Sequence, residues 1–124
     1  MTDRVVDASA IAAIVFQEAE EAQMRKRLRG LRLCAPPLLR FEIANVCLKK
    51  IRREPARRLE IIEQHDVSLN LPVEEFAVDT REVRAIAEDE TLSAYDASYL
   101  WLARRLGVEL VTLDQRLQKA AARI

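Results

Sequence analysis

The stretch Arg4-Val5-Val6-Asp7-Ala8-Ser9-Ala10-Ile11 decides the fold class, because it joins a strand to a helix through a carboxylate. The short apolar run that ends at Asp7 is typical of a buried strand. Residues 8–16 then carry apolar side chains at helical spacing: Ile11, Ile14 and Val15. The N-terminus is therefore predicted to form a strand that leads directly into a helix.

The rest of the chain alternates between the same two patterns. Strands are predicted at residues 4–7, 31–35, 67–71 and 108–113. Helices are predicted at residues 8–16, 18–29, 38–52, 73–87, 94–106 and from 115 onward, with a break at Pro55 and a helical restart to about residue 64. Such alternation indicates an α/β fold, a three-layer α/β/α sandwich with a central, mainly parallel sheet. With no linker in the sequence, residues 1–124 are expected to form a single domain.

Composition excludes several classes of protein. Half of the residues are hydrophobic, so the chain is not intrinsically disordered. No apolar run approaches the roughly 20 residues of a membrane span, and the N-terminus lacks a signal-peptide core. Cys34 and Cys47 form no CxxC motif and are interpreted as small buried residues. These features favour a cytoplasmic protein with no membrane association.

The formal net charge of zero hides an asymmetry between the two halves. Residues 1–62 carry a net charge of +5 and residues 63–124 carry −5, and six basic side chains lie within residues 49–58. Such a basic segment can hold a polyanion on one face of the protein, with Lys49, Lys50, Arg52 and Arg53 as the candidate contacts. An ordinary solvated helix surface is the alternative.

Four acidic residues are predicted to converge at one edge of the sheet. Asp7 and Asp114 each follow an apolar strand, and the carboxyl ends of parallel strands share an edge where ligands bind. Glu42 and Asp96 lie on predicted helices whose ends can reach that edge.

Each acid also has a simpler interpretation. Asp7 and Asp114 can cap the helices that follow them. Ser93 and Asp96 can form a variant of the capping box. Glu42 can face solvent, although its neighbours along the helix are apolar.

A cluster of four carboxylates implies a cation, because like charges brought together make each ionised form more costly. The chain has one histidine, His65, and no cysteine pair with zinc-site spacing, so zinc is disfavoured. Oxygen ligands favour Mg²⁺ or Mn²⁺. Such an ion lowers the pKa of a bound water to supply a hydroxide nucleophile, and it offsets charge on phosphate oxygens. The sequence therefore predicts phosphodiester hydrolysis.

Four motifs, in order along the chain, resemble those of the PIN-domain family. They are Asp7-Ala8-Ser9 (D-x-S/T), Glu42-Ile43-Ala44-Asn45 (E-x-x-N), Tyr95-Asp96-Ala97-Ser98-Tyr99 with the residues through Ala103 (Y-D-A-x-Y-x-x-L-A), and Thr112-Leu113-Asp114-Gln115-Arg116-Leu117 (T-x-D-x-x-L). The similarity is greatest to the VapC toxins of VapBC toxin–antitoxin pairs.

This resemblance implies a site and an activity. It implies an acidic metal site of Asp7, Glu42, Asp96 and Asp114, supported by the side chains of Ser9, Asn45 and Thr112. It also implies Mg²⁺- or Mn²⁺-dependent endoribonuclease activity on RNA, a homodimer, and an antitoxin that blocks the site. Core packing is the expected role of the stripe of Tyr95, Tyr99, Leu102 and Leu106, and capping or packing remains the alternative for Ser9 and Thr112.

Two alternatives to a nuclease stay open from sequence. A phospho-acceptor receiver domain has similar length and acids at strand ends, but it would need a lysine after the last strand, where Asp114 stands. A PIN fold that binds RNA or an antitoxin without cutting is the second alternative.

Overall fold

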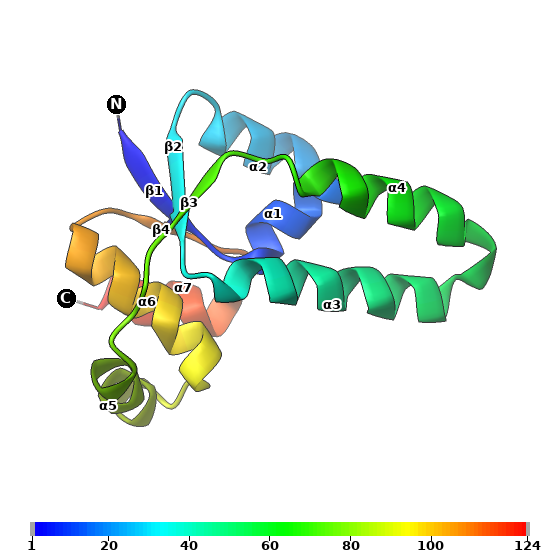
Figure 1. Ribbon diagram of the computed structural model, residues 1–124. Coiled ribbons are helices and arrows are strands. Elements are labelled where there is room, and N and C mark those ends of the chain that lie inside the picture. Colours follow the sequence, from blue (N-terminus) through cyan, green and yellow to red (C-terminus); the bar gives the residue numbers. More distant parts are fainter. Residues whose placement is uncertain (1, 124) are drawn as a thin grey trace.

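The computed structural model describes residues 2–123, and a parallel sheet forms its centre (Figure 1). The strands are β1 (Asp3–Val6), β2 (Arg32–Ala35), β3 (Val73–Glu75) and β4 (Leu110–Val111). The sheet has four strands in the order β3-β2-β1-β4, and every pair is parallel. This sheet confirms the predicted α/β class.

Helices cover the sheet in two groups. They are α1 (Ala8–Val15), α2 (Glu21–Leu28), α3 (Leu38–Arg53), α4 (Arg58–Ser68), α5 (Thr80–Glu90), α6 (Ala94–Leu106) and α7 (Gln115–Ala122), with the 3₁₀ turn η1 (Pro55–Arg57) before α4. Helices α1 to α4 contact one another, whereas α6 packs on β1, β4, α5 and α7. Figure 1 shows the two groups on opposite sides of the strands, as predicted for an α/β/α sandwich. Within residues 2–123, no helix combines the length and apolar character needed to cross a membrane.

The direction of the chain connections reverses between β1 and β4. The chain steps from β1 to β2 to β3 in one direction and then returns to place β4 on the other side of β1. Val6 lies beside Val111 in this pairing, so the residues that follow both strands meet at one edge. Ligand sites of open α/β sheets form at such a reversal.

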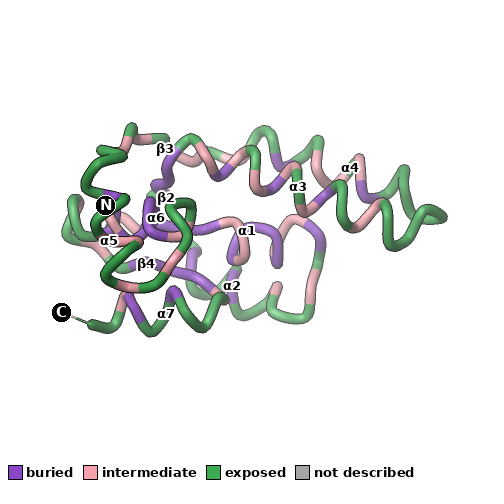
Figure 2. The backbone as a smooth tube through the Cα atoms, turned by 90° about the horizontal axis from the view of Figure 1, so that it is seen from below, coloured by how far each residue is buried: buried purple, intermediate pink, exposed green. Residues whose placement is uncertain are grey.

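The core lies between the sheet and the inner faces of the helices (Figure 2). Val5, Val6 and Val111 are fully buried, and α3 contributes Leu39, Ile43 and Cys47. Burial of such side chains stabilises the fold by about 1.5–3 kcal/mol each. By contrast, residues 52–60 at the far end of the α3–α4 pair are all exposed, and this pair projects as an arm.

The strand predicted at residues 67–71 is wrong. Helix α4 continues to Ser68, and turns follow it. A half-buried strand would bury Val67 and Leu69 and expose Ser68. The structure shows the reverse, since Ser68 is buried whereas Val67 and Leu69 are exposed. The buried Ser68 hydroxyl donates a hydrogen bond to the carbonyl of His65, so its hydrogen-bonding need is met within the helix.

The helix predicted at residues 73–87 is also wrong in its first part. Residues Val73–Glu75 form the edge strand β3, and α5 begins only at Thr80. An edge strand with two glutamates has no apolar alternation, so its sequence carries little signal. The Asp79 side chain caps α5 by accepting from the backbone N–H groups of Arg81 and Glu82 at 3.0 and 3.1 Å.

Asp79→Ala should lower the free energy of unfolding by about 1 kcal/mol, because it removes the acceptor for two N–H groups at the start of α5. Thermal and urea melts of the full chain measure this loss. The matched control is Asp89→Ala, which removes an exposed carboxylate from the last turn of the same helix. It should not lower the free energy of unfolding. Equal losses in both variants would contradict the capping role.

Candidate active site

Asp7 is buried at the end of β1, where it begins α1. Its Oδ1 accepts from the Ser9 hydroxyl at 2.7 Å and from the Ala10 N–H at 3.1 Å. Its Oδ2 accepts from the Thr112 hydroxyl at 2.6 Å. Both carboxylate oxygens are thereby fixed in position. These hydrogen-bond donors replace the water that the charged carboxylate loses on burial.

The same two hydroxyls join the end of β4 to the end of β1. The Leu113 N–H donates to Ser9 Oγ at 2.9 Å, and the Asp114 N–H donates to Thr112 Oγ1 at 3.0 Å. Ser9 and Thr112 therefore fix both the Asp7 carboxylate and the backbone that carries Asp114. The structure places both predicted supporting hydroxyls beside the acids.

Glu42 is half-buried on α3 and faces α6. The hydroxyl of Tyr99, a residue of α6, donates to Glu42 Oε1. Burial raises the pKa of Glu42, the Tyr99 hydrogen bond opposes that rise, and the charges of Asp96 and Asp7 add to it. Burial and the Glu42 carboxylate together raise the pKa of Tyr99 far above its usual value, so the phenol stays protonated and remains a donor.

Asp96 and Asp114 lie toward the solvent side of the same edge. Asp96 is in the first turn of α6, and its N–H donates to Ser93 Oγ at 3.0 Å. Burial raises the pKa of Asp96, and the charge of Asp114 raises it further. Asp114 is exposed and caps α7, since its Oδ1 accepts from the Leu117 N–H at 2.9 Å.

The structure thus brings the four predicted acids into one electrostatic neighbourhood. Burial raises the pKa of Asp7, hydrogen bonds from Thr112, Ser9 and Ala10 oppose the rise, and the charge of Asp96 adds to it. The capping interpretation of Asp7 and Asp114 is also correct, so a cap and membership of the cluster are compatible. Residues that cap helices supply carboxylates at fixed positions, which a binding site requires.

The donor set fits a hard divalent cation by its chemistry. All four side chains offer carboxylate oxygens, and their mutual repulsion would be relieved by a positive charge. Across residues 2–123, no three His, Cys, Asp or Glu side chains already stand close enough to enclose an ion.

The other predicted residues lie on α3, at or beyond the turn that follows Glu42. Asn45 is exposed on α3, three residues beyond Glu42. Lys50 pairs with Glu18 at 2.7 Å and lies over the Phe16 ring, so its ammonium group is engaged within the chain. The remaining basic candidates are exposed on the C-terminal half of α3: Lys49, Arg52 and Arg53.

Sequence reasoning placed Tyr99 in the core but missed its contact with Glu42. One signal placed Tyr99 on the side of α6 that carries an acid, because Tyr99 lies three residues after Asp96 on the same helix, but it did not identify Glu42 as the partner. Only the packing of α6 against the rest of the domain, which no local pattern encodes, brings its hydroxyl to α3.

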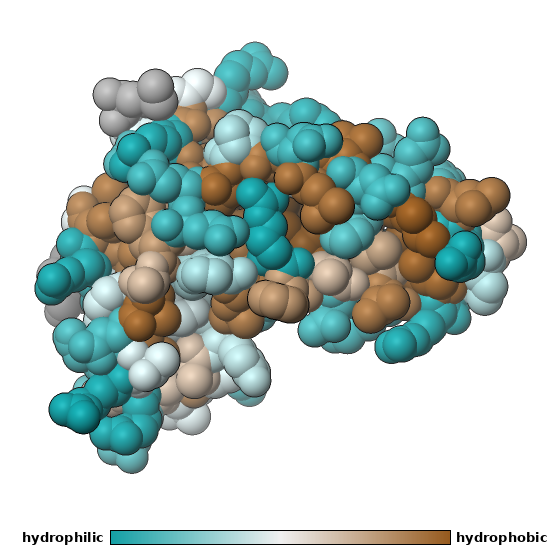
Figure 3. Space-filling view, viewed as in Figure 1, coloured by the Kyte–Doolittle hydropathy of each residue, from teal (hydrophilic) through white to brown (hydrophobic). Residues whose placement is uncertain are grey.

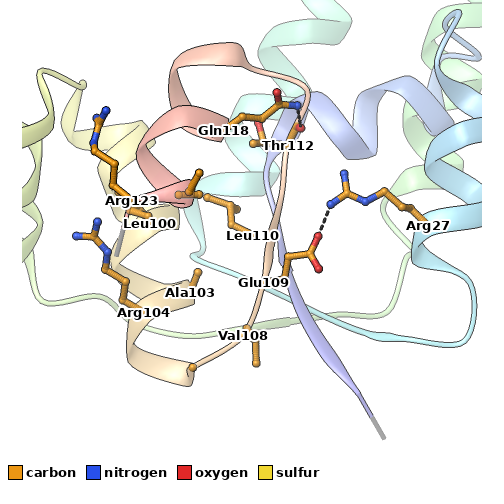
Figure 4. Close-up of a pocket in the computed structure, with 13 residues that line it drawn as sticks. Arg27, Leu100, Ala103, Arg104, Val108, Glu109, Leu110, Thr112, Gln118 and Arg123 are labelled. Atoms are coloured by element: carbon orange, nitrogen blue, oxygen red, sulfur yellow. Dashed lines mark hydrogen bonds and ion pairs between the residues drawn. The ribbon is translucent and has the colours of Figure 1, made fainter.

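One cavity is lined by none of the four acids. It measures about 820 Å³ and lies at the outer edge of β4, between α6 and α7 (Figure 4). Arg27 at its rim pairs with Glu109, and both Arg104 and Arg123 pair with Glu90. The Gln118 side chain donates to the Thr112 carbonyl at 2.8 Å, so this hydrogen bond ties α7 to the residue that follows β4.

Comparison with protein families identifies the class to which this fold and site belong. The model of the PIN domain matches residues 4–123. The chain therefore belongs to the PIN-domain family. This match confirms the resemblance seen in the four motifs and sets aside the receiver-domain alternative.

The chain is also similar to particular ribonucleases of the VapC type. It is 33% identical over 118 residues to Ribonuclease VapC3 of Pyrobaculum aerophilum, covering 91% of this chain and 90% of that protein. It is 29% identical over 116 residues to Ribonuclease VapC12 of Mycobacterium tuberculosis, covering 94% and 90%. The predicted similarity to VapC proteins is confirmed.

Two solved structures share the fold. The crystal structure of PAE2754 from Pyrobaculum aerophilum superposes with a TM-score of 0.77 at 24% identity, covering 98% of this chain and 81% of that one. VapC20 of Mycobacterium tuberculosis, described as a sarcin–ricin loop cleaving toxin, has a TM-score of 0.65 at 19% identity and covers 94% of each chain. These likenesses extend over nearly the whole described chain.

Glu42→Gln should raise the melting temperature of the metal-free chain by a few degrees near pH 7.5. The amide keeps an acceptor for Tyr99 and removes a charge that burial and two acids disfavour. Since the folded pKa of Glu42 lies above its unfolded value, this destabilisation is absent below the unfolded pKa and grows as pH rises through the folded one. The gain should therefore shrink toward about pH 4. Melts in EDTA at both pH values measure it, and a gain independent of pH would contradict the electrostatic cause.

Proposed function

We propose that this chain is a metal-dependent endoribonuclease, a single PIN-like nuclease domain over residues 1–124 that serves as the toxin of a type II toxin–antitoxin pair. The observation that carries the proposal is the set of Asp7, Glu42, Asp96 and Asp114 at the edge where the connections reverse. Similarity to VapC3 and VapC12, both named ribonucleases, supports the reaction. The fold shared with VapC20, described as a toxin, supports the biological role.

Mg²⁺ or Mn²⁺ is the proposed cofactor, held by Asp7, Glu42, Asp96 and Asp114. Carboxylate ligands suit these ions, and Cys34 and Cys47 do not have the spacing of a zinc site. When bound, such an ion supplies Lewis-acid chemistry, lowering the pKa of a water molecule and offsetting charge on the phosphate being cleaved.

Two hydroxyl groups position the Asp7 carboxylate within the proposed site. Ser9 and Thr112 hold both oxygens of Asp7, so its direction is fixed before any ligand arrives. Asp96 and Asp114 lie nearer the solvent, where RNA approaches. Without a cation the four carboxylates would repel a phosphodiester, which supports metal dependence.

The exposed side chains of Lys49, Arg52 and Arg53 are proposed to hold the RNA backbone. They follow Glu42 along α3, and the first of them lies about 10 Å beyond it, given a rise of about 1.5 Å per residue. Figure 3 shows the surface receding between the α3–α4 arm and the α5–α6 side of the molecule, where a strand of RNA could lie. Lys50 would contribute less, because it is paired with Glu18.

The proposed partners are an antitoxin that covers the acidic edge and a second copy of the chain. Exposed apolar side chains on one side of α3, Phe41 and Leu48, offer surface for such contacts. The cytoplasm is the proposed compartment, which the free thiols of Cys34 and Cys47 fit.

Asp7→Asn combined with Asp96→Asn should abolish RNA cleavage, because it removes two of the four proposed carboxylate ligands. The measurement is cleavage of total RNA by the purified full chain, free of antitoxin, with Mn²⁺ or Mg²⁺. Asp89→Asn, an equal change at an exposed site on α5, is the control and should cleave like the wild type.

Cleavage that survives the double substitution would exclude this mechanism. A wild-type chain that binds RNA and never cuts it with either ion would instead favour the non-cleaving PIN module. Circular dichroism of each variant separates loss of activity from loss of fold.

Lys49→Ala combined with Arg52→Ala should weaken binding of single-stranded RNA and reduce the slope of log affinity against log salt by about 1.4, which is about 0.7 for each phosphate that a side chain no longer neutralises. Fluorescence anisotropy over a salt series measures both effects. Lys26→Ala combined with Arg29→Ala is the matched control, because it removes two exposed cations at the end of α2 and in the turn before β2. It should change neither the affinity nor the salt slope. An equal change in both pairs would indicate a nonspecific effect of net charge.

A further inference from the structure

Tyr99 joins the two helices that carry Glu42 and Asp96. Its ring is 1% exposed within the core, yet its hydroxyl donates to Glu42 Oε1, 57 residues away in sequence. A buried phenol normally finds a hydrogen-bond partner, but here that partner is one of the four acids of the site. The ring is thus anchored by packing while its polar end reaches the cluster.

Helix α6 contributes to the cluster in two ways. It carries Asp96 in its first turn and Tyr99 three residues later on the same face. The position of Asp96 and the position of the Glu42 carboxylate therefore depend on one rigid element. Among the hydrogen bonds of residues 2–123, the one from Tyr99 is the only bond that links α6 to Glu42.

Glu42 needs such a restraint more than Asp7 does. Asp7 is buried and its two oxygens accept from Ser9, Thr112 and a backbone N–H. Glu42 is only half-buried, its side chain is longer, and Asp7 and Asp96 repel it. A glutamate in that position gains by turning toward solvent unless a donor holds it. The Tyr99 hydroxyl engages Oε1 and leaves the second oxygen to act as a ligand.

We propose that Tyr99 is a positioning residue, whose hydroxyl holds the Glu42 carboxylate at the acidic edge so that it can bind a divalent cation. This inference rests on the proposed metal-dependent function and names a residue outside the four acids and their predicted supports. Tyr99 acts through Glu42 and touches neither the cation nor RNA.

The direct test is the affinity of the full chain for Mn²⁺ alone, measured by isothermal titration calorimetry after removal of metal with EDTA. Tyr99→Phe removes one oxygen and keeps the buried ring. It should weaken Mn²⁺ binding by about tenfold or more, as loss of a residue that orients a metal ligand typically does. A purely structural role would lower the melting temperature and leave the affinity unchanged, and that result would overturn the proposal.

Tyr95→Phe is the matched control. Tyr95 lies on the same helix, one turn before Tyr99, but its side chain is 63% exposed. The same loss of one hydroxyl there should leave Mn²⁺ affinity within about twofold of wild type. Equal losses in the two variants would overturn the assignment to Tyr99.

A second variant keeps the proposal testable should Tyr99→Phe not fold. Replacing Tyr99 with 4-aminophenylalanine keeps the ring and an N–H donor, so Mn²⁺ binding within a few-fold of wild type is expected. Loss of binding in that variant, with its fold retained, would overturn the proposal. If wild type binds no Mn²⁺ at all, the proposed function itself fails, whereas wild-type binding that Tyr99→Phe leaves intact removes only the role of Tyr99.

Discussion

The buried carboxylate of Asp7 is the constraint on which the rest of the structure depends. An ionised group taken out of water costs several kcal/mol unless donors replace the lost hydration. Here the donors come from the start of α1 and from the end of β4. The chain must therefore place β4 beside β1 and begin α1 at once. Satisfying this one charge fixes the edge of the sheet at which the other acids gather.

The site combines an inner carboxylate that is held rigidly with outer ones that retain some freedom. Asp7 is fixed on both oxygens, Glu42 on one by Tyr99, and Asp114 lies in solvent as a helix cap. Under the proposed function, this gradient would leave the outer carboxylates free to adjust to a bound cation. Burial raises the pKa values of Asp7, Glu42 and Asp96, and neighbouring carboxylates raise them further. The charged forms of these acids therefore lower the stability of the fold at the proposed binding site.

Sequence patterns predicted the parts of this structure that local rules determine. Helix α6 runs from Ala94 to Leu106 as its start and stop signals indicate, and Asp7 and Asp114 follow neighbouring strands at one edge of the sheet, as predicted. The edge strand Val73–Glu75 was missed, because its two glutamates give it no apolar alternation, and the strand with which it pairs, β2, is distant in sequence. The bond between Tyr99 and Glu42 was missed because it depends on how α6 packs against α3. Pairings between distant helices are set by the whole domain, and no window of sequence contains them.

The projecting arm of α3 and α4 has a further consequence for how the molecule fluctuates. Glu42 lies at the base of α3, beside the buried Ile43, whereas residues 52–60 at the tip have no buried side chain. Helical turns with so little burial open at low free-energy cost, while those anchored in the core open only with global unfolding. The tip is therefore the part of the arm that opens most readily. The tip can change its conformation around a bound molecule while the base of α3, which carries Glu42, stays folded.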